Sequence, residues 1–275
     1  MYLINGIEVS KDNFNTPIES LSVWRGDGIF EAIRIHNGFL FALDRHLKRF
    51  ERSANKMLFK NIDFNSIKKD LIKLASNFTE GYVRVIISRS ETVESYDVYM
   101  FHQKPVDIPE NYSLQTQLSP WHPGGDFLLE ENQIIGTKST SYALNVTQTR
   151  LAEQNGFTDA LLLNRNNIIL EGPTFSLGWI KDDTVYIPDL DLGILDSITR
   201  QYINLFGAKG QLNVIESRIT ADEIYEMDTV FVLSTAKHGK FVNKIDEKVY
   251  EQSPVLKLIQ ECFIEEIEAE KQISN

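Results

Sequence analysis

The first third of the chain alternates β-prone runs with stretches that have helical spacing. An amphipathic helix is predicted after the short apolar run 39–43, with Asp44 at its N-cap. Its apolar positions recur at steps of three and four residues: Leu47, Phe50, Ala54 and Met57. A second helix is predicted over 66–78, and the β-branched run 82–88 after Gly81 predicts a strand.

The pattern changes near residue 120, where proline, glycine and serine concentrate in 119–125. Beyond this stretch we expect a helix over 140–155, another near Ser197 and a third after Thr220, where Thr220-x-x-Glu223 fits a capping box. Further strands are predicted at 97–102, 112–118, 159–163, 168–171, 175–180, 184–187 and 229–233.

These elements predict a mixed α/β protein with two lobes. The expected domains are an N-terminal α/β domain, an interdomain linker and a C-terminal α/β domain, at 1–118, 119–127 and 128–275. No repeat of fixed period stands out.

Composition and charge narrow the classes of protein. The chain has 28 Lys and Arg against 39 Asp and Glu, a net charge of −11, which argues against a general nucleic-acid binder or a polybasic membrane protein. No apolar run is long enough to span a bilayer, and Met1–Gly6 lacks a basic leader, so we expect a cytoplasmic protein. Cys262 is the single cysteine and cannot form an intrachain disulfide.

Three single residues and two segments suggest chemistry. Lys138 follows a short apolar stretch and a glycine; a lysine held there could form a Schiff base, although a solvated lysine is the simpler reading. Glu171 ends an apolar run and could pair with a protonated ring nitrogen or simply be exposed. A phosphate could bind at 193–200, where a glycine turn enters a helix, at Arg49 or at 234–236.

Other catalytic signatures are missing from the sequence. The five histidines show no metal-binding spacing, so we expect no metal and a structural or surface role for each. There is no Gly-x-Ser-x-Gly elbow, no Walker A motif and no dinucleotide-binding glycine fingerprint.

Taken in order, the candidate segments closely resemble the class IV aminotransferases, pyridoxal-phosphate (PLP) enzymes of fold type IV. The family includes branched-chain and D-amino-acid aminotransferases, (R)-selective amine transaminases and aminodeoxychorismate lyase. The resemblance spans about 5–246 and rests on these segments: 26–34, 46–50 with Ser53-Ala54, Lys138, Glu171-Gly172, 193–200 and 234–236.

The resemblance implies a smaller N-terminal and a larger C-terminal α/β domain with PLP between them, in a homodimer. It places Lys138 as the lysine of the internal aldimine and Glu171 at the pyridine nitrogen. The other implied cofactor contacts are Arg49, Ile198, Thr199 and Thr235 at the phosphate, Tyr142 near the ring oxygen, and Ser176. The implied substrate contacts are Phe30, Ser234 and Ala236.

The implied reaction moves an amino group between an amino acid, of branched-chain L- or D-type, and a 2-keto acid. Departures from the family pattern leave the substrate open. Ser176 stands where many members have asparagine, and Ser141 where several do; 90–95 lacks the arginine and histidine that D-amino-acid enzymes use to bind a carboxylate. Arg25 precedes the glycine turn, and we hypothesise that it binds a substrate carboxylate; an ion pair at the surface or an interface is the alternative. Aminodeoxychorismate lyase and a non-catalytic descendant remain alternative functions.

Overall fold

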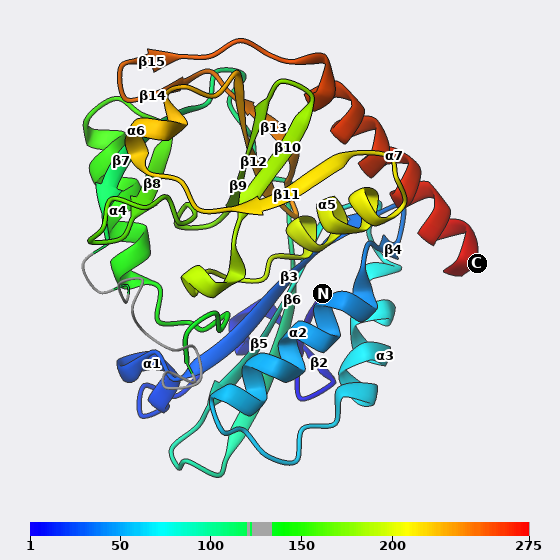
Figure 1. The fold of residues 1–275 in the computed structure, drawn as a ribbon. Coiled ribbons are helices and arrows are strands. Elements are labelled where there is room, and N and C mark those ends of the chain that lie inside the picture. Colours follow the sequence, from blue (N-terminus) through cyan, green and yellow to red (C-terminus); the bar gives the residue numbers. More distant parts are fainter. Residues whose placement is uncertain (120–121, 123–133, 275) are drawn as a thin grey trace. The chain divides into compact units, whose positions relative to one another are not determined.

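The computed structural model describes residues 1–119, 122 and 134–274, which form two compact units (Figure 1). Unit 1 comprises Met1–Val106, Thr137–Tyr142 and Ala269–Asn275, and unit 2 comprises Asp107–Gly136 and Ala143–Glu268. Most of the predicted linker 119–127 lies outside the described residues. Both units combine helices with sheets, so the predicted mixed α/β class is confirmed.

Unit 1 is built on a six-stranded sheet in which every neighbouring pair is antiparallel, in the order β2-β1-β6-β5-β3-β4. Its strands are β1 (Tyr2–Ile4), β2 (Ile7–Val9), β3 (Gly28–His36), β4 (Phe39–Leu40), β5 (Glu80–Arg89) and β6 (Tyr96–Gln103). Its helices are the 3₁₀ turn η1 (Lys11–Asn13), α1 (Leu21–Arg25), α2 (Leu43–Lys56) and α3 (Phe64–Ala75).

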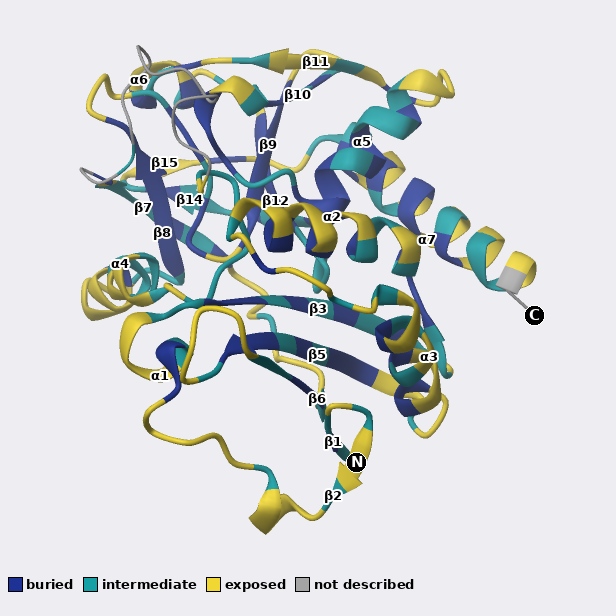
Figure 2. Cartoon of the chain, turned by 90° about the horizontal axis from the view of Figure 1, so that it is seen from below, coloured by how far each residue is buried: buried dark blue, intermediate teal, exposed yellow. Residues whose placement is uncertain are grey.

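Residues of β3 alternate between two environments, as the period of two in a strand requires. Ile29, Glu31, Ile33 and Ile35 are buried, whereas the residues between them are half-buried. Figure 2 shows β3 and β5 as buried or half-buried over most of their lengths. Glu31 is therefore a carboxylate within a row of isoleucines, and it needs partners inside the unit.

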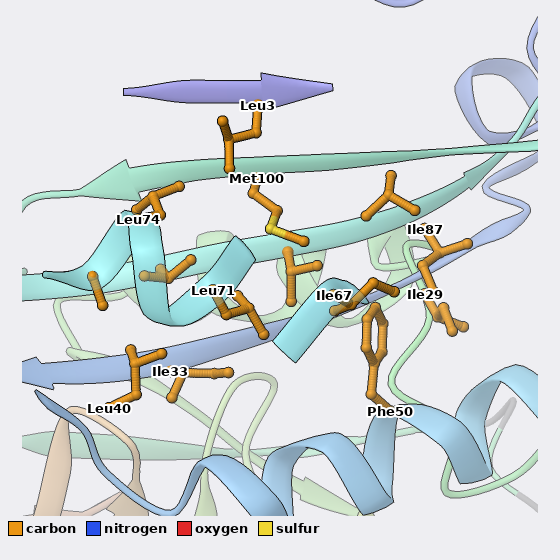
Figure 3. Close-up of a cluster of buried hydrophobic side chains, with 14 of the residues drawn as sticks. Leu3, Ile29, Ile33, Leu40, Phe50, Ile67, Leu71, Leu74, Ile87 and Met100 are labelled. Atoms are coloured by element: carbon orange, nitrogen blue, oxygen red, sulfur yellow. The ribbon is translucent and has the colours of Figure 1, made fainter. Parts of the chain in front are cut away.

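The helices α2 and α3 cover the sheet face that carries these isoleucines (Figure 3). Labelled members of the core beneath them are Leu3, Ile29, Ile33, Leu40, Phe50, Ile67, Leu71, Leu74, Ile87 and Met100. Burying each large apolar side chain contributes about 1.5–3 kcal/mol. This packing fixes which side of α2 faces β3, and so which α2 side chains can meet Glu31.

Unit 2 contains two sheets. The five-stranded sheet has the order β11-β10-β9-β12-β13, with β10 and β11 parallel, and the four-stranded sheet has the order β15-β14-β7-β8. The strands are β7 (Ser113–Leu118), β8 (Asp159–Leu163), β9 (Ser176–Lys181), β10 (Thr184–Pro188), β11 (Asn213–Ser217), β12 (Thr229–Ser234), β13 (Lys237–Val242), β14 (Lys244–Ile245) and β15 (Lys248–Val249). One core cluster combines both sheets, for example Leu114 and Leu161 with Trp179 and Val232.

Three helices of unit 2 lie where the sequence predicts them: α4 (Ala143–Gln154), α5 (Ile198–Ala208) and α6 (Ala221–Ile224). The 3₁₀ turn η3 (Leu190–Leu192) and the helix α7 (Pro254–Ser274), the last turns of which belong to unit 1, were not predicted. The capping box at Thr220 is present, with both reciprocal hydrogen bonds to Glu223. Within the described part of the chain, no helix is both long enough and apolar enough to cross a bilayer.

Two predictions of local structure are wrong. The run 168–171 forms isolated bridges, Leu163 with Ile169 and Ile168 with Thr220, and no strand. The helix α2 begins at Leu43, so Asp44 lies inside its first turn and the N-cap position is Ala42 in the left-handed region (φ 57°). No side-chain capping hydrogen bond is made there.

Candidate active site

The backbone of Lys138 is held on two sides. Phe30 N–H donates to the Lys138 carbonyl (3.1 Å), and Thr140 N–H donates to the Gly28 carbonyl (2.8 Å), so the segment around Lys138 runs antiparallel to the start of β3. The Lys138 N–H donates to Ser53 Oγ on α2 (3.3 Å). Because the N–H and the carbonyl of Lys138 are both hydrogen-bonded, the position from which its side chain extends is fixed.

The Lys138 amine lies among aromatic side chains. Its Nζ is 4.5 Å from the ring centroid of Phe30 and 5.9 Å from that of Tyr142, and these two rings meet edge to face at 5.5 Å. A second cation, Arg84, has its Cζ 5.8 Å from the Phe30 centroid and donates from Nε to Gln103 Oε1 (2.6 Å). Burial lowers the pKa of Arg84, which remains charged at neutral pH. The structure thus brings Phe30, Tyr142 and Lys138 together and adds Arg84.

The glycine turn before β3 packs against the residues that follow Lys138. Gly26 ends α1 in the left-handed region (φ 68°) and its carbonyl accepts from Thr140 Oγ1 (2.9 Å) and Ser141 Oγ (2.8 Å). A Cβ at Gly26 would lie 2.6 Å from Ser141 Oγ, so the close approach requires glycine. Arg25, just before this turn, is exposed, with its Cζ 4.1 Å from the centroid of the Trp24 ring.

Arg49 is buried and forms a bidentate ion pair. Its guanidinium donates from Nε to Glu31 Oε1 (2.7 Å) and from Nη2 to Glu31 Oε2 (2.6 Å). His46, one turn earlier on α2, places Nδ1 2.8 Å from Glu31 Oε2. All three side chains are at most 6% exposed. The sequence predicts Arg49 at the edge of the apolar face of the helix. In the structure its side chain is buried, because the Glu31 carboxylate in β3 pairs with it.

The charges of this triad depend on one another. Burial raises the pKa of Glu31, but the charge and hydrogen bonds of Arg49, with those of His46, bring that pKa far below its ordinary value. Burial lowers the pKa of His46; Glu31 opposes this effect, whereas the charges of Arg49 and Lys138 add to it. At neutral pH Glu31 is therefore ionised and His46 is neutral.

Replacing Glu31 with glutamine should lower the free energy of unfolding by about 3–5 kcal/mol, because it leaves the buried Arg49 without a counter-charge. Urea unfolding followed by circular dichroism measures the loss. The control is Glu80→Gln, since Glu80 pairs with Arg34 and its side chain is 46% exposed; there we expect a loss below about 1 kcal/mol. Equal losses in the two variants would contradict a special role for the buried pair.

In unit 2, Glu171 is half-buried and tied to the loop that precedes α5. Its Oε1 accepts the N–H of Leu195 (3.1 Å), and its carbonyl accepts the N–H of Leu162 in β8 (3.0 Å). The next residue, Gly172, approaches Phe175 so closely that a Cβ would lie 2.0 Å from the ring. The structure thus links Glu171 directly to the segment with the predicted phosphate contacts.

The predicted phosphate segment begins a regular helix. Ser197 caps α5, its Oγ accepting the N–H of Arg200 (3.1 Å), and Thr199 is 2% exposed. Ile198 and Thr199 occupy the first turn, where N–H groups have no acceptor within the helix. Such a helix start suits an anion. The Arg200 guanidinium pairs instead with Glu216, Nη2 to Oε2, at 2.6 Å.

Ser176 and Ser234 lie at the same end of the five-stranded sheet. Ser176 opens β9 and pairs with Leu233, the neighbour of Ser234 in β12. The two-residue turn Thr235–Ala236 follows, with Ala236 N–H donating to Ser234 Oγ (3.2 Å). Unit 2 therefore places these predicted contacts on one hairpin and the strand beside it.

Lys237, directly after this turn, belongs to a polar cluster that the sequence does not indicate. Its Nζ donates to Tyr112 Oη (2.6 Å) and lies 4.8 Å from the ring centroid of Phe175. Tyr112 Oη donates in turn to Asp159, which also accepts from Thr149 Oγ1 (2.7 Å). Burial lowers the pKa of Lys237 to about 8, although Asp159 opposes this, and burial with Asp159 raises the pKa of Tyr112.

This cluster predicts a rise in stability with pH. An unfolded lysine titrates near 10.4 and the folded Lys237 near 8, so between these values the unfolded chain binds more protons and rising pH favours the folded state. From pH 8 to 9.5 the wild type should gain about 1.5 kcal/mol more than Lys237→Met, measured by urea unfolding at both pH values. An identical pH dependence in the two proteins would refute this assignment.

The sequence family and the fold define the class of protein, the fold type IV enzymes that depend on PLP. The sequence model of the family Amino-transferase class IV matches residues 28–245. The D-alanine aminotransferase of Bacillus licheniformis is 25% identical over 252 residues, covering 89% of this chain and 88% of its own length. A putative branched-chain-amino-acid aminotransferase of Methanocaldococcus jannaschii is 23% identical over 274 residues, covering 92% and 90%.

Solved structures agree on the fold. A hypothetical aminotransferase from Mycobacterium tuberculosis in its PLP-bound form superposes with a TM-score of 0.87 at 19% identity, covering 98% of this chain and 99% of that one. The chain belongs to the class IV aminotransferase family, and it is a PLP-dependent transaminase with the fold type IV architecture.

Proposed function

We propose that this enzyme exchanges an amino group between an amino acid, of branched-chain L- or D-type, and a 2-keto acid, with Lys138 as the amine that holds PLP. The observation that carries the proposal is the placement of Lys138, which is anchored at its N–H by Ser53 and at its carbonyl by Phe30. The relatives are named D-alanine aminotransferase and branched-chain-amino-acid aminotransferase, and these names support D-amino acids and branched-chain amino acids as the proposed donors.

The residues present fit the cofactor. In unit 1, the buried Arg49 and a buried His46 nitrogen with no hydrogen-bond partner among the described residues lie on the same helix face as Ser53, the residue that binds the Lys138 backbone. In unit 2, the start of α5 and the Ser234–Ala236 hairpin offer hydroxyl and N–H groups. We assign Arg49, Ile198, Thr199 and Thr235 to the phosphate, with Tyr142, Glu171 and Ser176 at the ring.

When bound, PLP supplies the electron sink for bond changes at the α-carbon of the substrate. Lys138 Nζ would remove the α-proton as general base and then, as general acid, deliver that proton to the cofactor side and not back to the α-carbon. The Glu171 carboxylate keeps the pyridine nitrogen protonated. The Phe30 ring centroid lies 4.5 Å from the Lys138 amine, and we assign Phe30, with Ser234 and Ala236, to the substrate side of the site.

The reaction is tested by incubating the holoenzyme with a panel of paired L- and D-amino acids and (R)-amines, with 2-oxoglutarate as acceptor. We expect loss of the visible absorbance of the bound cofactor with one enantiomer and formation of one equivalent of keto acid. Release of pyruvate from aminodeoxychorismate without consumption of 2-oxoglutarate would identify a lyase instead. No spectral change with any donor would contradict the proposal. We further propose a homodimer, which light scattering would show as twice the chain mass.

Arg25 is the proposed carboxylate ligand of the acceptor. It is exposed and stacked on Trp24, and its guanidinium fork suits a carboxylate. Replacing Arg25 with leucine should raise KM for 2-oxoglutarate about tenfold, the effect of losing one charge-assisted hydrogen bond, with a smaller change for monocarboxylic keto acids. Arg150→Leu, on the exposed side of α4, is the matched control. An unchanged KM in the Arg25 variant rules out this role.

A further inference from the structure

The imidazole of His46 has one nitrogen that the fold leaves unsatisfied. The residue is 1% exposed, and Nδ1 is bound to Glu31, yet Nε2 is buried and has no hydrogen-bond partner among the described residues. A buried polar atom without a partner costs about 1–3 kcal/mol, and such atoms are rare in native proteins. A ligand that reaches Nε2 would recover this cost.

The protonation of the triad decides what that ligand must offer. Glu31 is ionised and can only accept hydrogen bonds, so the proton of the neutral imidazole resides on Nδ1. Nε2 then carries a lone pair. The fitting partner is an acidic O–H or N–H group whose proton can be shared with an imidazole.

The surroundings of His46 indicate which group this is. His46 and Arg49 bind the same oxygen, Glu31 Oε2, from successive turns of α2. The Lys138 charge is near enough to lower the His46 pKa, and Ser53, on the same side of α2, holds the Lys138 backbone. Among the described residues, the charged groups that act on the pKa of His46 are Glu31 in β3, Arg49 in α2 and Lys138. The His46 imidazole therefore shares Glu31 with Arg49, the proposed phosphate ligand, and lies within the electrostatic range of Lys138, the proposed cofactor lysine.

Charge balance favours a proton in this patch. The Glu31 carboxylate cancels the charge of Arg49, so the ion pair alone adds no net positive charge for a phosphate dianion. The environment lowers the pKa of His46 from the ordinary histidine value near 6.5, and a phosphate monoester has a second pKa near 6. A proton shared between Nε2 and a phosphate oxygen would supply the missing positive charge.

We propose that His46 Nε2 binds the phosphate group of the bound cofactor and shares one proton with it. The proton moves only between Nε2 and a phosphate oxygen, and no other bond changes. Glu31 serves as the positioning residue, because it holds both the imidazole and the Arg49 guanidinium. The inference rests on the proposed function, since the cofactor is what brings a phosphate to Arg49.

The test compares two probes on the apoprotein, PLP and pyridoxal, which lacks the phosphate. In His46→Gln the Kd for PLP should rise about tenfold or more, as expected for one hydrogen bond to a charged group, whereas the Kd for pyridoxal should stay unchanged. The matched control is His102→Gln, because His102 stacks on Phe78 and its Nε2 pairs with the Glu80 carbonyl (2.8 Å). This control should bind both probes like the wild type. If His46→Gln does not fold, His46→Asn replaces it.

Phosphorus NMR of the holoenzyme gives a readout that a merely structural histidine would not move. The bound phosphate resonance should differ between wild type and His46→Gln, and its dependence on pH between 5 and 9 should change. The same resonance and pH response in both, with an unchanged ratio of the two Kd values, would overturn the inference. A wild type that binds no PLP would refute the proposed function instead, so the two failures are distinguishable.

Discussion

Replacing Lys138 with arginine is expected to lower kcat for transamination by about 10³-fold or more. Arginine preserves the positive charge and the chain length, but it stays protonated and cannot act as the base that removes the α-proton. The variant should fold normally, because the backbone contacts of position 138 with Ser53 and Phe30 do not involve the side chain. Steady-state rates at saturating amino acid and 2-oxoglutarate measure the effect.

The control for this variant is Lys48→Arg, at an exposed position of α2, which should retain the wild-type kcat. A Lys138→Arg enzyme with a kcat within tenfold of the wild type would mean that another base does the chemistry. Lys237 is then the first residue to examine, because burial lowers its pKa to about 8 and so makes its amine easier to deprotonate than that of an ordinary lysine.

Replacing Glu171 with glutamine should reduce kcat by about 10²–10³-fold, an effect comparable to removing one preorganised electrostatic contact in other enzymes. Glutamine can still accept the Leu195 N–H that Glu171 Oε1 accepts, so the loop before α5 should keep its conformation. The neutral amide cannot hold the pyridine nitrogen in its protonated form. The loss should therefore appear in kcat, with little change in the amount of cofactor bound.

The matched control is Glu153→Gln on the exposed side of α4. Rates and cofactor content are measured on the same preparations of both variants, with circular dichroism as the check on folding. If Glu171→Gln keeps a kcat within twofold of the wild type, the carboxylate does not act on the ring nitrogen. Glu171 would then be a structural residue that only ties the loop at Leu195 to β8.

The local pattern of apolar and polar residues was sufficient to predict the helices and strands in which apolar residues recur with a clear period. The strand β5 and the helices α3 and α4 lie within a few residues of their predicted ranges. The start of α2 could not be predicted in the same way. The N–H of Ala42 is satisfied by Glu270 Oε2 (2.9 Å), more than 200 residues away in sequence, so the cap is a tertiary contact that no local pattern shows.

The Lys138 site was predictable in part, because a lysine after a glycine between two elements is visible in the sequence. The partners of Arg49 were not. Glu31 interrupts a row of isoleucines in β3, and this was the one available signal that a buried cation must lie opposite. Nothing in the sequence indicated a role for His46. Its neutral state depends on its burial and on the charges of Glu31, Arg49 and Lys138, which only the structure shows.

The central claim is that the Lys138 side chain holds PLP covalently, and borohydride reduction tests it most directly. The reconstituted holoenzyme is reduced, digested and sequenced by mass spectrometry. We predict one cofactor per chain, fixed on the peptide that contains Lys138, and none on that peptide in Lys138→Arg. Cofactor fixed on another lysine, or no fixed cofactor in a yellow wild-type enzyme, would contradict the account.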